Sequence, residues 1–137
     1  MLPVLAVSVL VRRDDRVLLV RRAQPPFADS WAFPGGKVLA GEALAIAATR
    51  ETREETGVAI RDLRQLDLVE IIERDSDGMV SSHHVLVVFA ATADEVAAAA
   101  GDDAAEARWV AVEELAGLAL TPDTRRLLRA HLPWSSR

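Results

Sequence analysis

Three glutamates near the middle of the chain, Glu51, Glu54 and Glu55, are spaced so that they could act together on a metal ion. In a helix, residues three or four positions apart share one face, so these carboxylates would lie together. The same face carries Ala47 and Ala48, so the acids would continue an apolar stripe that packs against the protein. Carboxylates crowded there repel one another and lose solvation unless a cation balances them.

A hard divalent cation provides that balance, because carboxylate oxygens are the ligands that Mg²⁺ and Mn²⁺ prefer. The alternative is an ordinary charged surface helix with ion pairs such as Arg50–Glu54. Such a helix places its acids opposite the apolar stripe and gives each one an oppositely charged neighbour. The pattern therefore favours a metal site, with Mg²⁺ as the expected cofactor and Mn²⁺ as a substitute.

A helix over about residues 42–56 must carry these acids. Gly57 fits the left-handed position that ends many helices, and Val58 can close the apolar contact of such a cap. Before the helix, Gly35 and Gly36 predict a loop. Glycines there are either a simple turn or a place where backbone groups approach a metal or a phosphate closely.

The spacing from Gly36 to Val58 resembles the signature of the Nudix hydrolases, Mg-dependent enzymes that cleave nucleoside diphosphates linked to another moiety. The stretch reads GKVLAGEALAIAATRETREETGV, and the WAFPGG run before it also resembles the family. Thr52 departs from the pattern, since the family prefers an aliphatic residue there. The resemblance implies a single domain over residues 1–137, an α/β/α sandwich with a mixed sheet and a loop-helix-loop motif over 36–58.

The resemblance also implies roles for the residues of the motif. Its metal ligands are the carboxylates of Glu51, Glu54 and Glu55 and the backbone carbonyl of Gly36. Glu51 is implied to orient or deprotonate the attacking water as well. Arg50 is implied to hold the glutamates in place, and Glu42 to pair with it across the loop. The simpler alternative for Arg50 and Glu42 is that they only stabilise the motif.

The implied reaction suits a set of metal-binding carboxylates, because metals spanning a diphosphate neutralise its charge and lower the pKa of bound water. The expected substrate is a small nucleotide, either a nucleoside triphosphate or a nucleotide-sugar such as ADP-ribose. Two alternatives stay open: a sensor module that binds nucleotide without turnover, and an enzyme that acts on the 5′ end of RNA. All motif glutamates are present, which disfavours the inactive sensor.

An additional acidic ligand is expected between residues 94 and 106, where family members often contribute one. Asp103 and Glu106 are the candidates, although acids in a solvated loop are the simpler reading. In the same region, Thr92 and Glu95 fit a capping box, which predicts a short alanine-rich helix ending at Gly101.

Several residues outside the helix are candidates for substrate contacts: Arg21, Arg22, Phe27, Gly35 and His83. Each has an ordinary alternative, such as a strand-end arginine or a hydrogen-bonded structural histidine. His83 and His84 are adjacent, so in a strand they point to opposite faces and cannot serve one site. Trp31 and Phe33 share a strand face and are expected in the core.

The remaining pattern predicts strands joined by turns, followed by a closing helix. The predicted strands are Val4–Val11, Arg16–Arg22, Trp31–Phe33, Leu63–Arg74, Ser82–Thr92 and Trp109–Val110, and the helix runs from Thr121 to about His131. The first pair forms a hairpin, and Asp75–Gly78 is the turn between the two long strands.

Composition narrows the class of partner. The chain is 50% apolar and 27% charged, which is an ordinary globular balance. Its net charge of −5 argues against a nucleic-acid or anionic membrane surface, whereas bound metals still allow an anionic small substrate. The absence of cysteine excludes disulfides, and the apolar start over residues 1–11 is too short to span a bilayer. A cytoplasmic location is expected, and a homodimer stays open.

Overall fold

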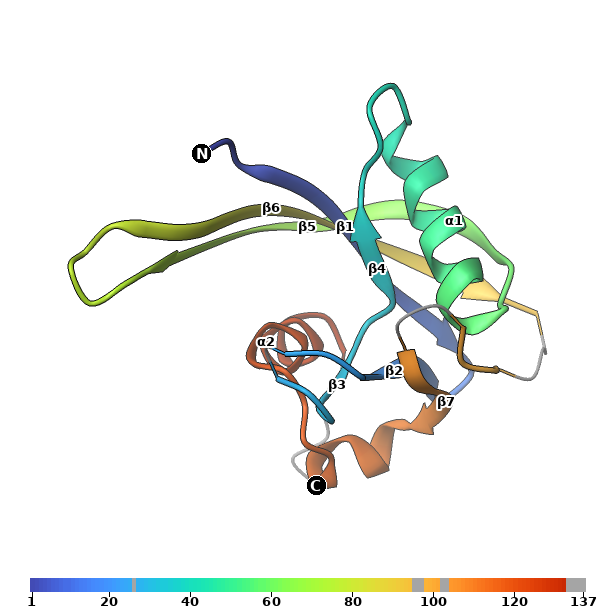
Figure 1. Cartoon of the computed structure of the whole chain (residues 1–137). Coiled ribbons are helices and arrows are strands. Elements are labelled where there is room, and N and C mark those ends of the chain that lie inside the picture. Colours follow the sequence, from blue (N-terminus) through green and yellow to red (C-terminus); the bar gives the residue numbers. More distant parts are fainter. Residues whose placement is uncertain (26, 95–97, 102–103, 133–137) are drawn as a thin grey trace.

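The computed structural model describes residues 1–25, 27–94, 98–101 and 104–132, and a seven-stranded mixed sheet forms its centre (Figure 1). The strands are β1 (Val4–Arg13), β2 (Arg16–Arg22), β3 (Trp31–Ala32), β4 (Gly35–Lys37), β5 (Ile60–Arg74), β6 (Val80–Ala93) and β7 (Ala104–Ala111). The helical elements are α1 (Leu44–Thr56), the 3₁₀ helix η1 (Val112–Gly117) and α2 (Pro122–His131). Within the described ranges, no helix is long and apolar enough to cross a membrane.

The strand order is β3-β2-β1-β6-β5, with β4 also paired to β1 and β7 to β2. The pairing of β1 with β6 is parallel, from Val4 opposite His84 to Arg12 opposite Thr92, and the other pairings between strands are antiparallel. The predicted mixed sheet and β1–β2 hairpin are therefore confirmed. In Figure 1 the long β5–β6 hairpin projects away from the rest of the molecule.

Two apolar clusters occupy the two faces of the sheet. Alternation along β1 sends Val9 to one cluster and Leu10 to the other, as expected for successive residues of a strand. Ala47 of α1 belongs to the cluster with Val9, whereas Leu128 of α2 belongs to the cluster with Leu10. One helix thus covers each face, which confirms the predicted α/β/α sandwich. Trp31 and Phe33 are buried in the α2 cluster, as expected.

The glycines before α1 lie in a strand, so the predicted loop is wrong at this point. Gly35 pairs with Ser8 of β1 and Gly36 with Val7, which makes β4. A Cβ on Gly35 would collide with the carbonyl oxygen of Val7 and lie 2.9 Å from the Cα of Ser8. Glycine is required here by the close approach of strands β1 and β4 rather than by a turn.

The alanine-rich segment also differs from its prediction. Thr92 pairs with Arg61 inside the β5–β6 hairpin, so it continues a strand instead of capping a helix. Ala98 to Gly101 have no helical structure, and Glu95 lies outside the described residues. The backbone N–H groups of Ala99 and Gly101 instead donate to carbonyls at the end of α1, so contacts with another element override the helix propensity of alanine.

The last strand is longer than predicted. β7 begins at Ala104 rather than Trp109, because it pairs with β2 from Arg22 opposite Ala104 to Arg16 opposite Ala111. The pairing with β2 accounts for the strand here, since the alanines and charges of this stretch lack strong strand propensity.

Candidate active site

Helix α1 begins at Leu44, two residues later than predicted. Glu42 lies in the turn before it, where its N–H donates to the carbonyl of Leu39 at 3.0 Å. The N–H of Leu39 in turn donates to Oε1 of Glu42 at 3.0 Å. These two bonds hold the Glu42 side chain beside the start of the helix.

The end of α1 agrees with its prediction. Gly57 has a left-handed φ of 73°, and its N–H donates to the carbonyl of Arg53 at 2.8 Å. Val58 is fully buried in the cluster that α1 covers, so it makes the apolar contact expected of this cap.

The buried stripe of α1 contains Ala47 and Ala48, as predicted, but it does not continue through the acids. Its buried members are Ala47, Ala48, Thr52 and Thr56. The glutamates flank the stripe: Glu51 is only 16% exposed, whereas Glu54 is 44% exposed. The prediction that all the acids continue the stripe is therefore wrong, because Thr52 and Thr56, at i+4 and i+8 from Ala48, take the buried positions.

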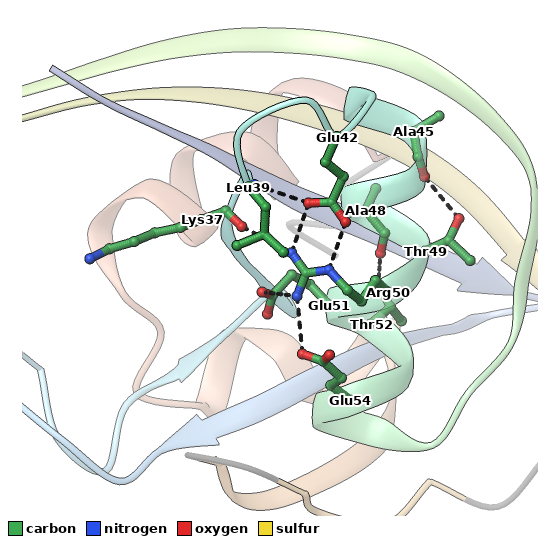
Figure 2. Close-up of polar contacts among 10 residues, drawn as sticks. All are labelled: Lys37, Leu39, Glu42, Ala45, Ala48, Thr49, Arg50, Glu51, Thr52 and Glu54. Carbon is green, nitrogen blue, oxygen red and sulfur yellow. Dashed lines mark hydrogen bonds and ion pairs between the residues drawn. The ribbon is translucent and has the colours of Figure 1, made fainter.

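Arg50 contacts three glutamates at once, and we call these four residues the Arg50 cluster: Arg50, Glu42, Glu51 and Glu54 (Figure 2). Its Nε donates to Oε2 of Glu42 at 2.7 Å and its Nη2 donates to Oε1 of Glu42 at 2.9 Å, which is a bidentate pair. Its Nη1 donates to Oε1 of Glu51 at 2.8 Å and to Oε2 of Glu54 at 3.1 Å. Nη2 also donates to the carbonyl of Lys37 at 3.1 Å. A single guanidinium thus ties the helix, the turn before it and β4 together.

These contacts shift the ionisation of both partners of the bidentate pair. Hydrogen bonds from Arg50 and from the N–H of Leu39 lower the pKa of Glu42 from 4.5 to about 2. Hydrogen bonds to Glu42 and Glu51 raise the pKa of Arg50 further above its ordinary value. Both groups therefore stay charged at neutral pH.

Strand β4 lies against two of the glutamates, Glu51 and Glu55. The N–H of Gly35 donates to Oε1 of Glu55 at 2.7 Å. A Cβ on Gly36 would lie 2.5 Å from the carboxylate carbon of Glu51, so the missing side chain leaves the space that this carboxylate fills. The glycines thus place the strand against the acids of the helix.

The donor set has the chemistry that a hard cation requires. Glu51, Glu54 and Glu55 offer carboxylate oxygens, and Gly36, which lies against Glu51, has a backbone carbonyl of the kind that a hard cation also binds. No group of three acid or histidine side chains converges on a single point in the part of the chain that the structure describes. As they stand, Glu51 and Glu54 both face Arg50, so a bound ion would have to compete with this guanidinium for their oxygens.

The structure brings Glu106 together with Arg21. Oε1 of Glu106, on β7, accepts from Nε of Arg21 at 3.3 Å, and Nη1 of Arg21 donates to Oδ1 of Asp29 at 3.0 Å. Arg22 follows at the end of β2 and is half-buried. Asp103, the other predicted acidic ligand, lies outside the described residues.

The other residues predicted to contact substrate lie in different environments. Phe27 is exposed, with a left-handed φ of 62°. The N–H of Gly35 donates a hydrogen bond to Oε1 of Glu55. His83 lies on β6, with Nε2 3.6 Å from Oε2 of Glu70.

Two backbone groups of the cluster were not predicted: the carbonyl of Lys37 and the N–H of Leu39. The sequence could not predict these contacts, because every residue has a backbone carbonyl and nearly every residue has a backbone N–H, whatever its side chain.

A model of the NUDIX domain matches residues 2–131 of this chain. The chain belongs to the Nudix family. An ADP-ribose pyrophosphatase of Methanocaldococcus jannaschii is 31% identical over 134 residues, covering 98% of this chain and 76% of the relative.

Solved structures agree with the assignment to the Nudix hydrolases. A MutT Nudix hydrolase from Burkholderia pseudomallei is 30% identical, with a TM-score of 0.82 over 94% of this chain and 98% of that one. The Nudix domain of Shewanella oneidensis NrtR, in complex with ADP ribose, is 25% identical, with a TM-score of 0.79 over 94% of this chain and 86% of that one. The family and these relatives identify the chain as a hydrolase.

Proposed function

We propose that this Nudix hydrolase cleaves the diphosphate of a nucleotide-sugar of the ADP-ribose type, with Mg²⁺ bound by the acids of α1. The observation that carries the proposal is the cluster in which Arg50 binds Glu42, Glu51 and Glu54 while Gly35 binds Glu55. These contacts gather the carboxylates where α1 meets β4, and a cation would replace Arg50 as the partner of Glu51 and Glu54.

The substrate class is supported by similarity. The Methanocaldococcus relative that matches almost the whole chain is an ADP-ribose pyrophosphatase, and the Shewanella Nudix domain was crystallised with ADP ribose. The net charge of −5 is consistent with a small substrate recognised through metal rather than a polyanion that binds along a basic surface.

Each residue has a distinct part in the proposed reaction. Glu51, Glu54 and Glu55 would hold the ion, together with the carbonyl of Gly36. Bound Mg²⁺ would neutralise phosphate charge and make a bound water more acidic. Glu51 lies against Gly36 of β4, and as a carboxylate it can accept a proton from the attacking water. Arg50 keeps the carboxylates in position through its charge-assisted hydrogen bonds.

The test is chromatographic analysis of nucleotide products with Mg²⁺ or with EDTA. The panel contains ADP-ribose, NADH, dinucleoside polyphosphates, nucleoside triphosphates, oxidised guanine nucleotides and an RNA with a 5′ triphosphate. Mg²⁺-dependent formation of AMP from ADP-ribose is the expected result. Preference for a triphosphate or for the RNA would overturn the substrate class but keep the reaction. Metal-dependent binding without cleavage of any compound would instead support a sensor.

A further inference from the structure

The C-terminal end of α1 is held by a segment from elsewhere in the chain, residues 98–101. The N–H of Ala99 donates to the carbonyl of Thr56 at 3.0 Å, and the N–H of Gly101 donates to the carbonyl of Glu55 at 3.0 Å. Figure 1 shows this segment passing beside the end of the helix. We name residues 98–101 the clamp segment.

The clamp segment satisfies groups that the helix cannot satisfy itself. The last four carbonyls of an α-helix have no partner within the helix. Here Arg53 is satisfied by the N–H of Gly57, whereas Glu55 and Thr56 depend on the clamp segment. These two bonds therefore connect the final turn of α1 to the chain that leads into β7.

Gly101 makes the closest contact of the clamp segment. A Cβ on Gly101 would collide with the carbonyl oxygen of Glu54. The φ of Gly101 is not positive, so its backbone is accessible to other residues and the requirement for glycine is steric. The obstacle is a backbone atom, which cannot rotate away as the end of a side chain can.

The residues that receive these contacts carry the acids of the proposed metal site. Gly101 touches the carbonyl of Glu54 and hydrogen-bonds that of Glu55, while the Glu55 side chain is bound by the N–H of Gly35. We propose that Gly101 is a positioning residue for the reaction, because its close approach sets where the last turn of α1 presents Glu54 and Glu55. The inference rests on the proposed function. It differs from simple capping in predicting that metal binding and the clamp depend on each other.

The direct test compares Gly101→Ala with Gly117→Ala. Gly117 lies at the end of η1, has no positive φ and has open space around its Cβ position, so it reports the effect of the same substitution without a clash. Mn²⁺ affinity is measured by isothermal titration calorimetry, kcat and KM with saturating Mg²⁺, and folding by thermal unfolding. Gly101→Ala is expected to lose roughly 10–100-fold in Mn²⁺ affinity or kcat, whereas Gly117→Ala matches the unmodified protein.

The outcomes separate this inference from the function on which it rests. If the unmodified protein binds Mn²⁺ and Gly101→Ala binds it equally and turns over equally, only the role of Gly101 is overturned. If the unmodified protein neither binds Mn²⁺ nor cleaves any nucleotide, the proposed function falls and this inference falls with it.

A measurement on the unmodified protein decides the matter even if Gly101→Ala does not fold. Amide hydrogen exchange is followed by NMR with and without Mg²⁺. Because coupling is reciprocal, Mg²⁺ is expected to slow exchange of the Ala99 and Gly101 amides. The amide of Gly78, in the turn between β5 and β6, serves as the control and should not change. Equal exchange at Ala99 and Gly101 with and without Mg²⁺ would overturn the inference.

Discussion

Gly36 lies directly against the carboxylate of Glu51, although the two residues are fifteen positions apart in the sequence. A Cβ at this position would lie 2.5 Å from the carboxylate carbon and 2.5 Å from Oε2. The Glu51 carboxylate can therefore occupy this position only because Gly36 has no side chain. This contact joins strand β4 to the helix that carries the three glutamates.

Gly36→Ala is expected to reduce kcat roughly 10–100-fold, because the added methyl group displaces the Glu51 carboxylate. The fold should survive, since the atoms in the way belong to the end of a flexible side chain. Steady-state kinetics with saturating Mg²⁺ and thermal unfolding measure the two effects, with Gly117→Ala as control. An unchanged kcat would show that the position of Glu51 does not matter for turnover.

Glu54→Gln is expected to lower kcat by roughly 10²–10³-fold, because it removes a charge that balances the metal while changing little volume. The side chain is 44% exposed, so the free energy of unfolding should change little. Glu73→Gln makes the same chemical change at an exposed position of the β5–β6 hairpin and should leave kcat unaltered. Full turnover of Glu54→Gln with saturating Mg²⁺ would contradict the assignment of this carboxylate as a ligand.

Thr52→Val tests the one departure from the family pattern. The Thr52 side chain is fully buried and its hydroxyl donates to the carbonyl of Ala48 at 2.8 Å, away from the Arg50 cluster. We expect turnover close to that of the unmodified protein and a change in unfolding free energy within about 1 kcal/mol. Urea unfolding and steady-state kinetics provide these values. A large loss of turnover in folded Thr52→Val would mean that this hydroxyl shapes the site.

Glu42 should make stability depend on pH in the acidic range. Its pKa is lowered from 4.5 to about 2 in the folded protein, so folding is favoured by the ionised form. The stabilisation is complete above about pH 4.5 and is lost as the pH falls toward 2. Urea unfolding of the unmodified protein and of Glu42→Gln should thus differ most above pH 4.5, and the difference should shrink at lower pH. A difference that grows on acidification would contradict the lowered pKa.

Local rules predicted those parts of the site that depend on neighbours in sequence. The left-handed cap at Gly57 and the buried Val58 follow from the C-terminal rules for helices. The same rules failed over residues 98–101, where alanines favour a helix but the chain is occupied with capping α1. They failed again at Gly35, because a three-residue strand forms only when β1 is already beside it.

The sequence by itself determined the family, the helix that bears the acids and the chemistry of their oxygens, because these follow from residue type and from spacing along one helix. Only the tertiary structure decided which hydrogen-bond donor each carboxylate binds. Arg50 binds Glu42, Glu51 and Glu54, whereas Glu55 turns to the N–H of Gly35. That division depends on how β4 packs against α1, and a contact between two elements is set by the whole sheet that supports them rather than by the pattern of either element alone.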